Sequence, residues 1–147
     1  ALLHQKLNVS ENVSEVDLRK YLTELAELVK NSYDSKKKSI QLVIHCEIEL
    51  ISIEKALPIG LIIVELISNS MKHAFNSRQT GTITIQLEKD ELNSNVLRFT
   101  DDGIGFDFSK KREKGLGIEI INGLTGQLGA DVETSKGKGF ILTARFK

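Results

Sequence analysis

Residues 58–75 read PIGLIIVELISNSMKHAF, and the interpretation of the chain starts from this stretch. Pro58 suits the first turn of a helix, which we extend to about Phe75. At about 100° per residue, Glu65, Asn69 and Lys72 fall within about 60° of one another, with His73 beside them. The far side carries Ile59, Ile63, Ile67 and Ala74.

A helix that is apolar on nearly every other side is expected to be buried, so its polar stripe needs partners. Glu65 and Asn69 place an acid and an amide one turn apart, and these oxygen ligands suit a hydrated Mg²⁺ ion. The alternative is a solvated helix edge. For Lys72 or His73 taken alone, the solvated edge is the preferred interpretation.

The residues before this helix predict one further helix and two strands. Leu18, Leu22 and Leu25 recur at helical spacing from Asp17 to about Tyr33, and Ser14 and Asp17 offer an N-terminal cap. Residues 40–46 alternate between apolar and other side chains, which predicts a strand. A second short strand is expected at residues 50–53.

The residues after it predict four strands and another helix. The expected strands cover residues 81–88, 96–100, 131–135 and 140–146, and the helix covers about 118–128. The order is therefore α-β-β-α-β-β-loop-α-β-β. Adjacent strands joined by short turns indicate a mixed, mostly antiparallel sheet with helices on one face, which is an α/β (α+β) two-layer sandwich.

Three glycine-rich segments fall at the ends of these elements. Asp101-Asp102-Gly103-Ile104-Gly105 follows a strand directly, and its glycines permit a tight turn that a ligand can approach closely. Gly115-Leu116-Gly117 begins a helix, where free N–H groups favour phosphate. Gly137-Lys138-Gly139 would ordinarily be a hairpin turn. Each segment is weak evidence alone, since Asp-Asp-Gly is a common turn sequence, but their order and spacing are informative.

Asp101 has a chemical role to offer at the end of its strand. Its carboxylate can accept a hydrogen bond from an exocyclic amine such as that of adenine. The chain has neither the Gly-x-x-x-x-Gly-Lys-Ser/Thr phosphate loop nor the Gly-x-Gly-x-x-Gly dinucleotide pattern. The sequence therefore points away from both of those nucleotide folds.

Composition excludes several classes of partner. The chain has 147 residues with 20 basic and 20 acidic side chains, so no bulk field favours nucleic acid or a membrane surface. It suits one compact domain. No apolar run is long enough to span a bilayer. The single cysteine, Cys46, reads as a buried thiol in a reducing compartment, and we expect a cytoplasmic location.

The motifs together resemble the ATP-binding catalytic domain of sensor histidine kinases. Glu65-Leu-Ile-Ser-Asn69-Ser-Met-Lys72-His73-Ala-Phe75 resembles the N box of that family, and the three glycine segments match its successive glycine boxes in order. The ending Lys-His-Ala-Phe and the short loop before Gly115 resemble the subfamily with a variant phosphoacceptor helix. The resemblance implies the Bergerat-type ATP-binding fold shared with gyrase, Hsp90 and the mismatch-repair ATPases.

The resemblance implies a role for each matching residue. Asn69 would coordinate Mg²⁺, Asp101 would bind the adenine amino group, and Glu65 would polarise or orient the incoming histidine. Lys72 would approach the phosphates and His73 would lie beside the nucleotide. The resemblance places four glycines around the base, namely Gly103, Gly105, Gly137 and Gly139. It places Gly115, Leu116 and Gly117 around the triphosphate.

The loop between Gly105 and Gly115 contains four basic residues and reads either as a short ATP lid or as a solvated charged loop. His4 lies close to the expected end of the upstream helix, and His45 lies on a strand. We therefore expect no phosphoacceptor histidine in this chain. Residues 1–12 are expected to be the end of an upstream dimerisation helix and linker, and residues 13–147 the ATP-binding domain.

The expected partners are the upstream dimerisation and phosphoacceptor domain and, indirectly, a response regulator. Two alternatives remain open. One is an ATPase or protein-serine kinase on the same fold, and the other is a non-catalytic interaction module that has lost useful nucleotide binding.

Overall fold

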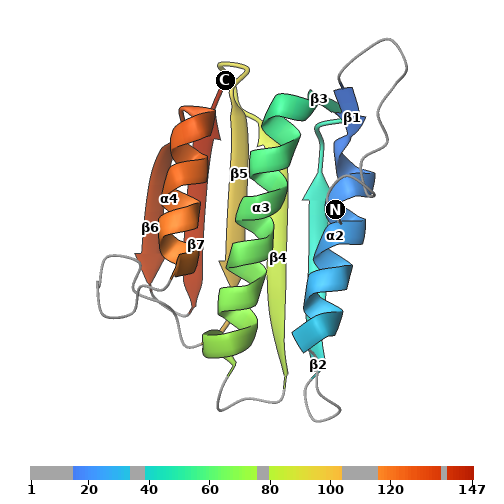
Figure 1. Ribbon diagram of the computed structural model, residues 1–147, viewed down its shortest axis with the longest axis vertical. Helices are drawn as coiled ribbons and strands as arrows, with labels where there is room; N and C mark the ends of the chain where they lie inside the picture. The colour runs from blue at the N-terminus through green and yellow to red at the C-terminus, as the bar shows by residue number, and fades with distance from the viewer. Residues whose placement is uncertain (1–14, 34–38, 76–79, 104–115, 137–138) are drawn as a thin grey trace.

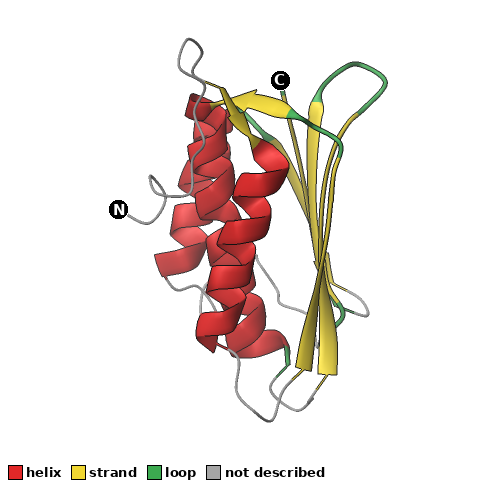
Figure 2. Cartoon of the chain, turned by 90° about the vertical axis from the view of Figure 1, so that its right-hand side faces the viewer, coloured by secondary structure: helices red, strands yellow, loops and turns green. Residues whose placement is uncertain are grey.

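The computed structural model describes residues 15–33, 39–75, 80–103, 116–136 and 139–147, and it shows a sheet covered on one face by helices (Figure 1). Seen from the side, the helices form one layer and the strands the other (Figure 2). The predicted two-layer sandwich is confirmed.

The main sheet has five strands in the order β2-β4-β5-β7-β6. Its strands are β2 (Ser39–Cys46), β4 (Thr80–Lys89), β5 (Asn95–Asp101), β6 (Asp131–Lys136) and β7 (Phe140–Phe146). β2 and β4 are parallel, and the other three neighbouring pairs are antiparallel. The sheet is therefore mixed and mostly antiparallel, as the sequence predicts.

Alternation of side chains turns one face of this sheet toward the helices. On β4 the residues Gly81, Ile83, Ile85 and Leu87 are buried, and the residues between them are only partly covered. On β5 the residues Leu97, Phe99 and Asp101 are buried, and they belong to the same alternation. An acid thus occupies a position of the core-facing row at the end of β5.

Within the described ranges, three helices cover that face. They are α2 (Leu18–Tyr33), α3 (Ile53–Asn69), which continues into the π-helix η1 (Ser70–Ala74), and α4 (Leu116–Leu128). α3 lies in the middle and packs against both α2 and α4. Asp17 caps α2 as predicted, because its Oδ1 accepts from the N–H of Lys20 at 3.1 Å.

The contact between α2 and α3 includes one unusual pair. Tyr21 is fully buried, and a Cβ added to Gly60 would lie 2.1 Å from the Tyr21 hydroxyl oxygen. The hydroxyl has no hydrogen-bond partner among the described residues. Burial raises the pKa of Tyr21 to about 12.

The central helix begins earlier than predicted. α3 begins at Ile53, and Pro58 lies inside it rather than in its first turn. Pro58 leaves the carbonyl of Glu54 without its helical N–H donor, but Ala56 and Pro58 are both buried by the extra turns. Tertiary burial therefore outweighs the local preference of proline.

The short strand at residues 50–53 has a different partner from the one that its position in the chain suggests. β3 (Leu50–Ser52) does not continue a hairpin with β2 but pairs antiparallel with β1 (Glu15–Asp17) in a separate two-stranded sheet. β1 was not predicted, because three residues are too short to reveal an alternation. Cys46, which ends β2, is a buried free cysteine as predicted.

Candidate nucleotide site

The carboxylate of Asp101 is buried where β5, β7 and the end of α3 meet. One oxygen, Oδ1, accepts from the backbone N–H of Gly103 at 3.1 Å and from that of Phe140 at 3.3 Å. The other, Oδ2, accepts from the hydroxyl of Ser70 at 2.7 Å. Only 6% of Asp101 is exposed. Three separate segments of chain therefore hold one acceptor group in place.

β7 approaches Asp101 so closely that position 139 has no room for a Cβ and requires glycine. A Cβ at Gly139 would lie 1.9 Å from the backbone oxygen of Asp101, a distance that no side-chain movement relieves because the obstacle is main chain. Phe140, the next residue, pairs with Asp101 in the ladder between β5 and β7. The glycine thus brings the Phe140 N–H within reach of the carboxylate.

The second acid of the turn has a structural contact. Asp102 is exposed, and its Oδ1 accepts from the N–H of Thr82 at 2.8 Å, while its own N–H donates to the Thr82 oxygen at 3.2 Å. These bonds tie the residue after β5 to β4. They hold Gly103 in the tight turn that the sequence predicts at this point.

Two of the four residues of the predicted polar stripe, Glu65 and Asn69, lie on α3, which ends at Asn69 rather than near Phe75. Ile59, Ile63 and Ile67 are fully buried, whereas Glu65 and Asn69 are half-buried. The two residues are thus partly accessible, on the side of the helix that also carries the half-buried Leu61. An amide oxygen in that position fits a Mg²⁺ ion that keeps waters and phosphate oxygens as its other ligands.

Lys72 and His73 lie beyond Asn69 in the π-helix, and both are exposed. The Lys72 ammonium lies 5.7 Å from the centroid of the Tyr33 ring at the end of α2. This is the distance of a cation–π contact. Tyr33 was not predicted to take part in the site, and nothing in its helical spacing distinguishes it from other residues that end a helix.

Ser70 was also missed, although the sequence contained a usable signal. It lies seven residues after Ile63, so an α-helix places it on the same buried face. A polar side chain on that face needs a hydrogen-bond partner. That requirement could have singled out Ser70 but not its partner, which lies 31 residues away in the chain.

The remaining glycines are less informative. Gly105, Gly115 and Gly137 fall outside the described residues, as does the predicted lid loop. Leu116 and Gly117 belong to the first turn of α4, and only their backbone is described. In the described part of the chain, no group of three or more His, Cys, Asp or Glu side chains is arranged to hold a metal.

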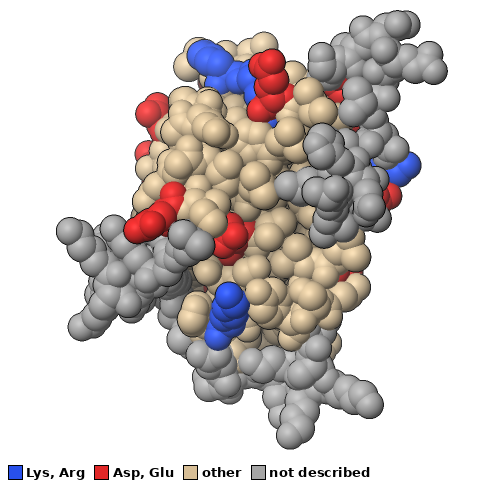
Figure 3. All heavy atoms as spheres, in the orientation of Figure 1, with Lys and Arg blue, Asp and Glu red and all other residues tan. Residues whose placement is uncertain are grey.

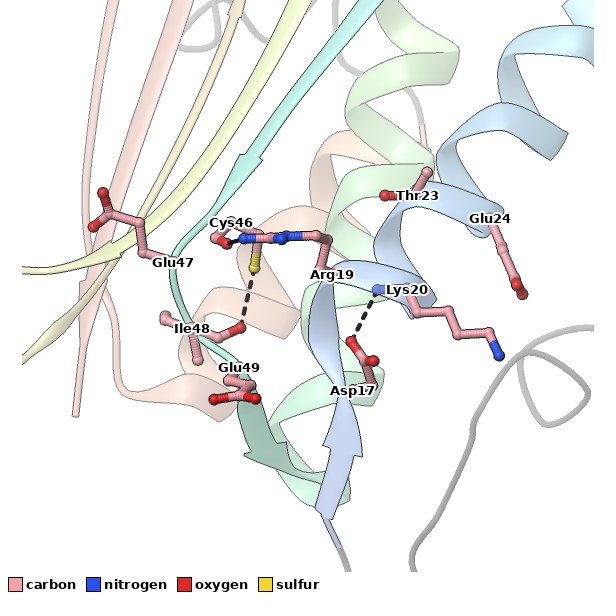
Figure 4. Close-up of a pocket in the computed structure, with 9 residues that line it drawn as sticks. All are labelled: Asp17, Arg19, Lys20, Thr23, Glu24, Cys46, Glu47, Ile48 and Glu49. Atoms are coloured by element: carbon pink, nitrogen blue, oxygen red, sulfur yellow. Dashed lines mark hydrogen bonds between the residues drawn. The ribbon is translucent and has the colours of Figure 1, made fainter.

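A separate hollow of about 600 Å³ lies at the other end of the sheet, where β2 ends and α2 begins (Figure 4). The side chain of Arg19 reaches across it to donate to the carbonyl of Cys46. The Cys46 thiol donates to the Ile48 carbonyl at 3.3 Å, and burial raises the pKa of this thiol. Its other lining residues are Asp17, Lys20, Thr23, Glu24, Glu47 and Glu49. It contains none of the predicted site residues.

The face of the molecule in Figure 3 does not add a second candidate. On the helix-covered face shown in Figure 3, the acidic and basic side chains of the described residues are scattered, and neither sign forms a continuous patch. Among the described residues, no helix combines the length and the apolar character needed to cross a membrane.

Comparison of the sequence with known families identifies the class of protein that has this fold. The pattern of the family described as histidine kinase-, DNA gyrase B-, and HSP90-like ATPase matches residues 54–147. The chain therefore belongs to this ATPase family. The resemblance noted in the sequence is confirmed.

Its relatives are histidine kinases. The chain is 29% identical over 144 residues to blue-light-activated histidine kinase 2 of Erythrobacter litoralis, which covers 92% of this chain and 40% of that protein. It is 34% identical over 96 residues to sensor histidine kinase ComP of Bacillus subtilis, which covers 61% of this chain and 12% of that protein. The chain thus spans less than half the length of these relatives.

Solved structures agree on the fold. The histidine kinase domain of a blue-light-activated histidine kinase from Erythrobacter litoralis superposes with a TM-score of 0.83 at 23% identity, covering 99% of this chain and 69% of that one. Full-length ShkA in complex with AMPPNP gives a TM-score of 0.69 at 17% identity, covering 96% of this chain and 32% of that one.

Proposed function

We propose that this chain is the ATP-binding catalytic domain of a sensor histidine kinase. It would hold ATP·Mg²⁺ so that the γ-phosphoryl group passes in line to a histidine on a dimerisation domain, and a response regulator would receive the phosphoryl group afterwards. In this proposal residues 1–12 lead from that domain and residues 13–147 bind the nucleotide. The parent protein would act in the cytoplasm.

The observation that carries the proposal is the fixed acceptor at Asp101. Hydrogen bonds from Ser70, Gly103 and Phe140 hold its carboxylate, so little reorganisation is needed when a base arrives. A carboxylate that only accepts hydrogen bonds complements the exocyclic amine of adenine and opposes a carbonyl oxygen at the same place. The site thereby selects an adenine nucleotide.

The helix end beside Asp101 supplies the groups for the phosphates. Asn69 would ligate Mg²⁺ through its amide oxygen, and the ion would neutralise charge on the phosphate oxygens when bound. Lys72 would reach the phosphates and His73 would lie beside the nucleotide. The backbone N–H groups at Leu116 and Gly117 begin α4 and offer donors to the triphosphate.

Glu65 would orient the histidine that receives the phosphoryl group. Neutral imidazole already has a free lone pair, so positioning and charge neutralisation matter more than removal of a proton. Gly105, Gly115 and Gly137 would complete the glycine turns around the base and the phosphates. The basic loop before Gly115 would act as the lid.

Two assays distinguish the kinase from the two alternatives, an ATPase and a non-catalytic interaction module. Steady hydrolysis of ATP by the isolated chain favours an ATPase, whereas transfer to a supplied dimerisation helix that carries a histidine favours the kinase. A folded chain that binds no nucleotide is an interaction module.

The first test is a calorimetric titration with a non-hydrolysable ATP analogue, with and without Mg²⁺. Asp101→Asn keeps the size of the side chain but puts an amide donor where the carboxylate accepts, so we expect a loss of about 10- to 100-fold in affinity. Asp102→Asn is the matched control, because it makes the same change of charge at the next residue. Equal affinity of wild type and Asp101→Asn would remove the adenine contact.

A further inference from the structure

Ser70 makes the shortest of the three hydrogen bonds that Asp101 receives. The Ser70 hydroxyl donates to Oδ2 at 2.7 Å, whereas the two backbone N–H groups reach Oδ1 at 3.1 and 3.3 Å. Ser70 is 4% exposed and Asp101 6%. A short bond between a hydroxyl and a carboxylate in a water-poor site is among the stronger kinds of hydrogen bond.

The two oxygens of Asp101 depend on different parts of the fold. Oδ1 is fixed by backbone N–H groups of the turn and of β7, at Gly103 and Phe140. Within the described residues, the bond recorded for Oδ2 comes from a single side chain on the helix layer. The direction in which Oδ2 points therefore depends on Ser70.

The position of Ser70 is itself well fixed. It is the first residue of the π-helix, and its backbone N–H bonds to the carbonyls of Leu66 and Ile67 at the end of α3. Short π-helical turns often occur at functional sites, because the wider turn changes where the following side chains point. Ser70 follows Asn69 directly, so one helix end would set both the metal ligand and the base acceptor.

We propose that Ser70 is a positioning residue for nucleotide selection, holding Oδ2 of Asp101 so that a free lone pair meets the 6-amino group of adenine. This inference rests on the proposed adenine site. Ser70 uses one lone pair of Oδ2, and the carboxylate oxygen has a second. Without the hydroxyl, Oδ2 is free to turn away while Oδ1 remains anchored.

The test measures affinity for two ligands, a non-hydrolysable ATP analogue and the matching analogue of purine riboside triphosphate, which lacks the 6-amino group. Wild type should bind the ATP analogue about 10-fold or more tightly than the purine analogue. Ser70→Ala should lose most of this preference: affinity for the ATP analogue falls about 10-fold, and affinity for the purine analogue changes less than about twofold. Ser70→Thr keeps the hydroxyl and should restore the preference.

If Ser70 had a purely structural role, Ser70→Ala would lower the affinity for both ligands equally, and that result overturns the inference. A Ser70→Ala variant with unchanged preference overturns it as well. A wild type that binds both ligands with equal affinity overturns the proposed adenine site together with this inference. If Ser70→Ala does not fold, Ser70→Cys keeps a weak donor of similar shape and should lose part of the preference in the same direction.

Discussion

Two contacts of the helix layer are built from the same parts, a buried hydroxyl group and a glycine with no room for a methyl group. At the end of α3, the Ser70 hydroxyl meets Asp101, whose backbone oxygen blocks a Cβ on Gly139. Between α2 and α3, the Tyr21 hydroxyl itself blocks a Cβ on Gly60. Only the first hydroxyl has a hydrogen-bond partner among the described residues.

In the proposed function, the first contact serves the nucleotide site, whereas the second serves packing alone. A buried hydroxyl without a partner costs roughly 1–3 kcal/mol, which the packing of the Tyr21 ring has to offset. A buried hydroxyl on a carboxylate fixes the direction of an acceptor. Burial of polar atoms therefore does not identify a site by itself, and the identity of the partner does.

The largest effect on stability is expected at Gly139. Gly139→Ala puts a Cβ against main chain that cannot turn aside, so we expect a loss of about 3 kcal/mol in the free energy of unfolding. Urea unfolding measures it. Gly123→Ala is the control: nothing lies within 4 Å of a Cβ there, and alanine in α4 should raise stability by up to about 1 kcal/mol. Unchanged stability of Gly139→Ala would contradict the close approach of β7.

The next effect depends on pH and on Tyr21. Its pKa is raised to about 12 by burial, so between pH 10 and 12 the unfolded chain loses a proton that the folded chain keeps. Stability should then fall as pH rises, by about 2 kcal/mol from this residue between pH 9 and 11.5. Denaturant unfolding across this pH range should show this loss of unfolding free energy in wild type, and Tyr21→Phe should lack it.

Tyr33→Phe is the control for removing a tyrosine hydroxyl at an exposed position, because Tyr33 is 38% exposed. At neutral pH, Tyr21→Phe should also gain about 1 kcal/mol, since it removes a buried hydroxyl with no described partner. A loss of stability instead would show that the hydroxyl has a partner and would erase the contrast with Ser70.

A smaller effect tests the packing contact directly. Gly60→Ala would place a Cβ 2.1 Å from the Tyr21 hydroxyl oxygen and 2.8 Å from the ring carbon that bears this hydroxyl. We expect a loss of about 1–2 kcal/mol, reduced by the better helix propensity of alanine. Combined with Tyr21→Phe, part of the loss should be recovered. Additive effects in the double-mutant cycle would mean that the two residues do not press on one another.

The smallest effect concerns the cation beside the site. The contact of Lys72 with the Tyr33 ring is worth about 0.5–1 kcal/mol at an exposed position. In the proposed function the ammonium would have to give up this contact to reach the phosphates. Tyr33→Leu should therefore raise affinity for the ATP analogue about two- to fourfold. Calorimetry of the same substitution in a Lys72→Met background should show no change, and a gain there would exclude this explanation.

The sequence predicted the helices and strands that follow from a local repeat of apolar residues. It did not predict the features that depend on contacts between segments distant in the chain. Strands β4 and β7 and the buried side of α3 follow from alternation and helical spacing, because each residue's neighbours in the chain set those patterns. The start of α3 at Ile53 and the pairing of β1 with β3 depend on tertiary burial and on pairing between distant segments, which local patterns do not encode.

The same limit applies within the site. Asp101 was predicted as a site residue from its place after a strand, and Asn69 from the polar stripe on its helix, and both assignments stay predictions. Ser70 carried a weak signal, and Tyr33 carried none, because the π-helical turn and the end of α2 come together only in the folded protein. The roles of the glycine turns stay predictions.

The hydrogen bonds of Asp101 also bear on the order in which the protein folds. Two of the three join residues 31 and 39 positions away in the chain, and β2 reaches its parallel neighbour β4 only after α3 has crossed between them. Closing such long loops is slow compared with forming the hairpins at β4–β5 and β6–β7. The acceptor should therefore be completed late in folding, and the contacts that form last break first, so the Phe140 amide should exchange its hydrogen with solvent through a partial opening at a lower free energy than unfolding of the whole domain.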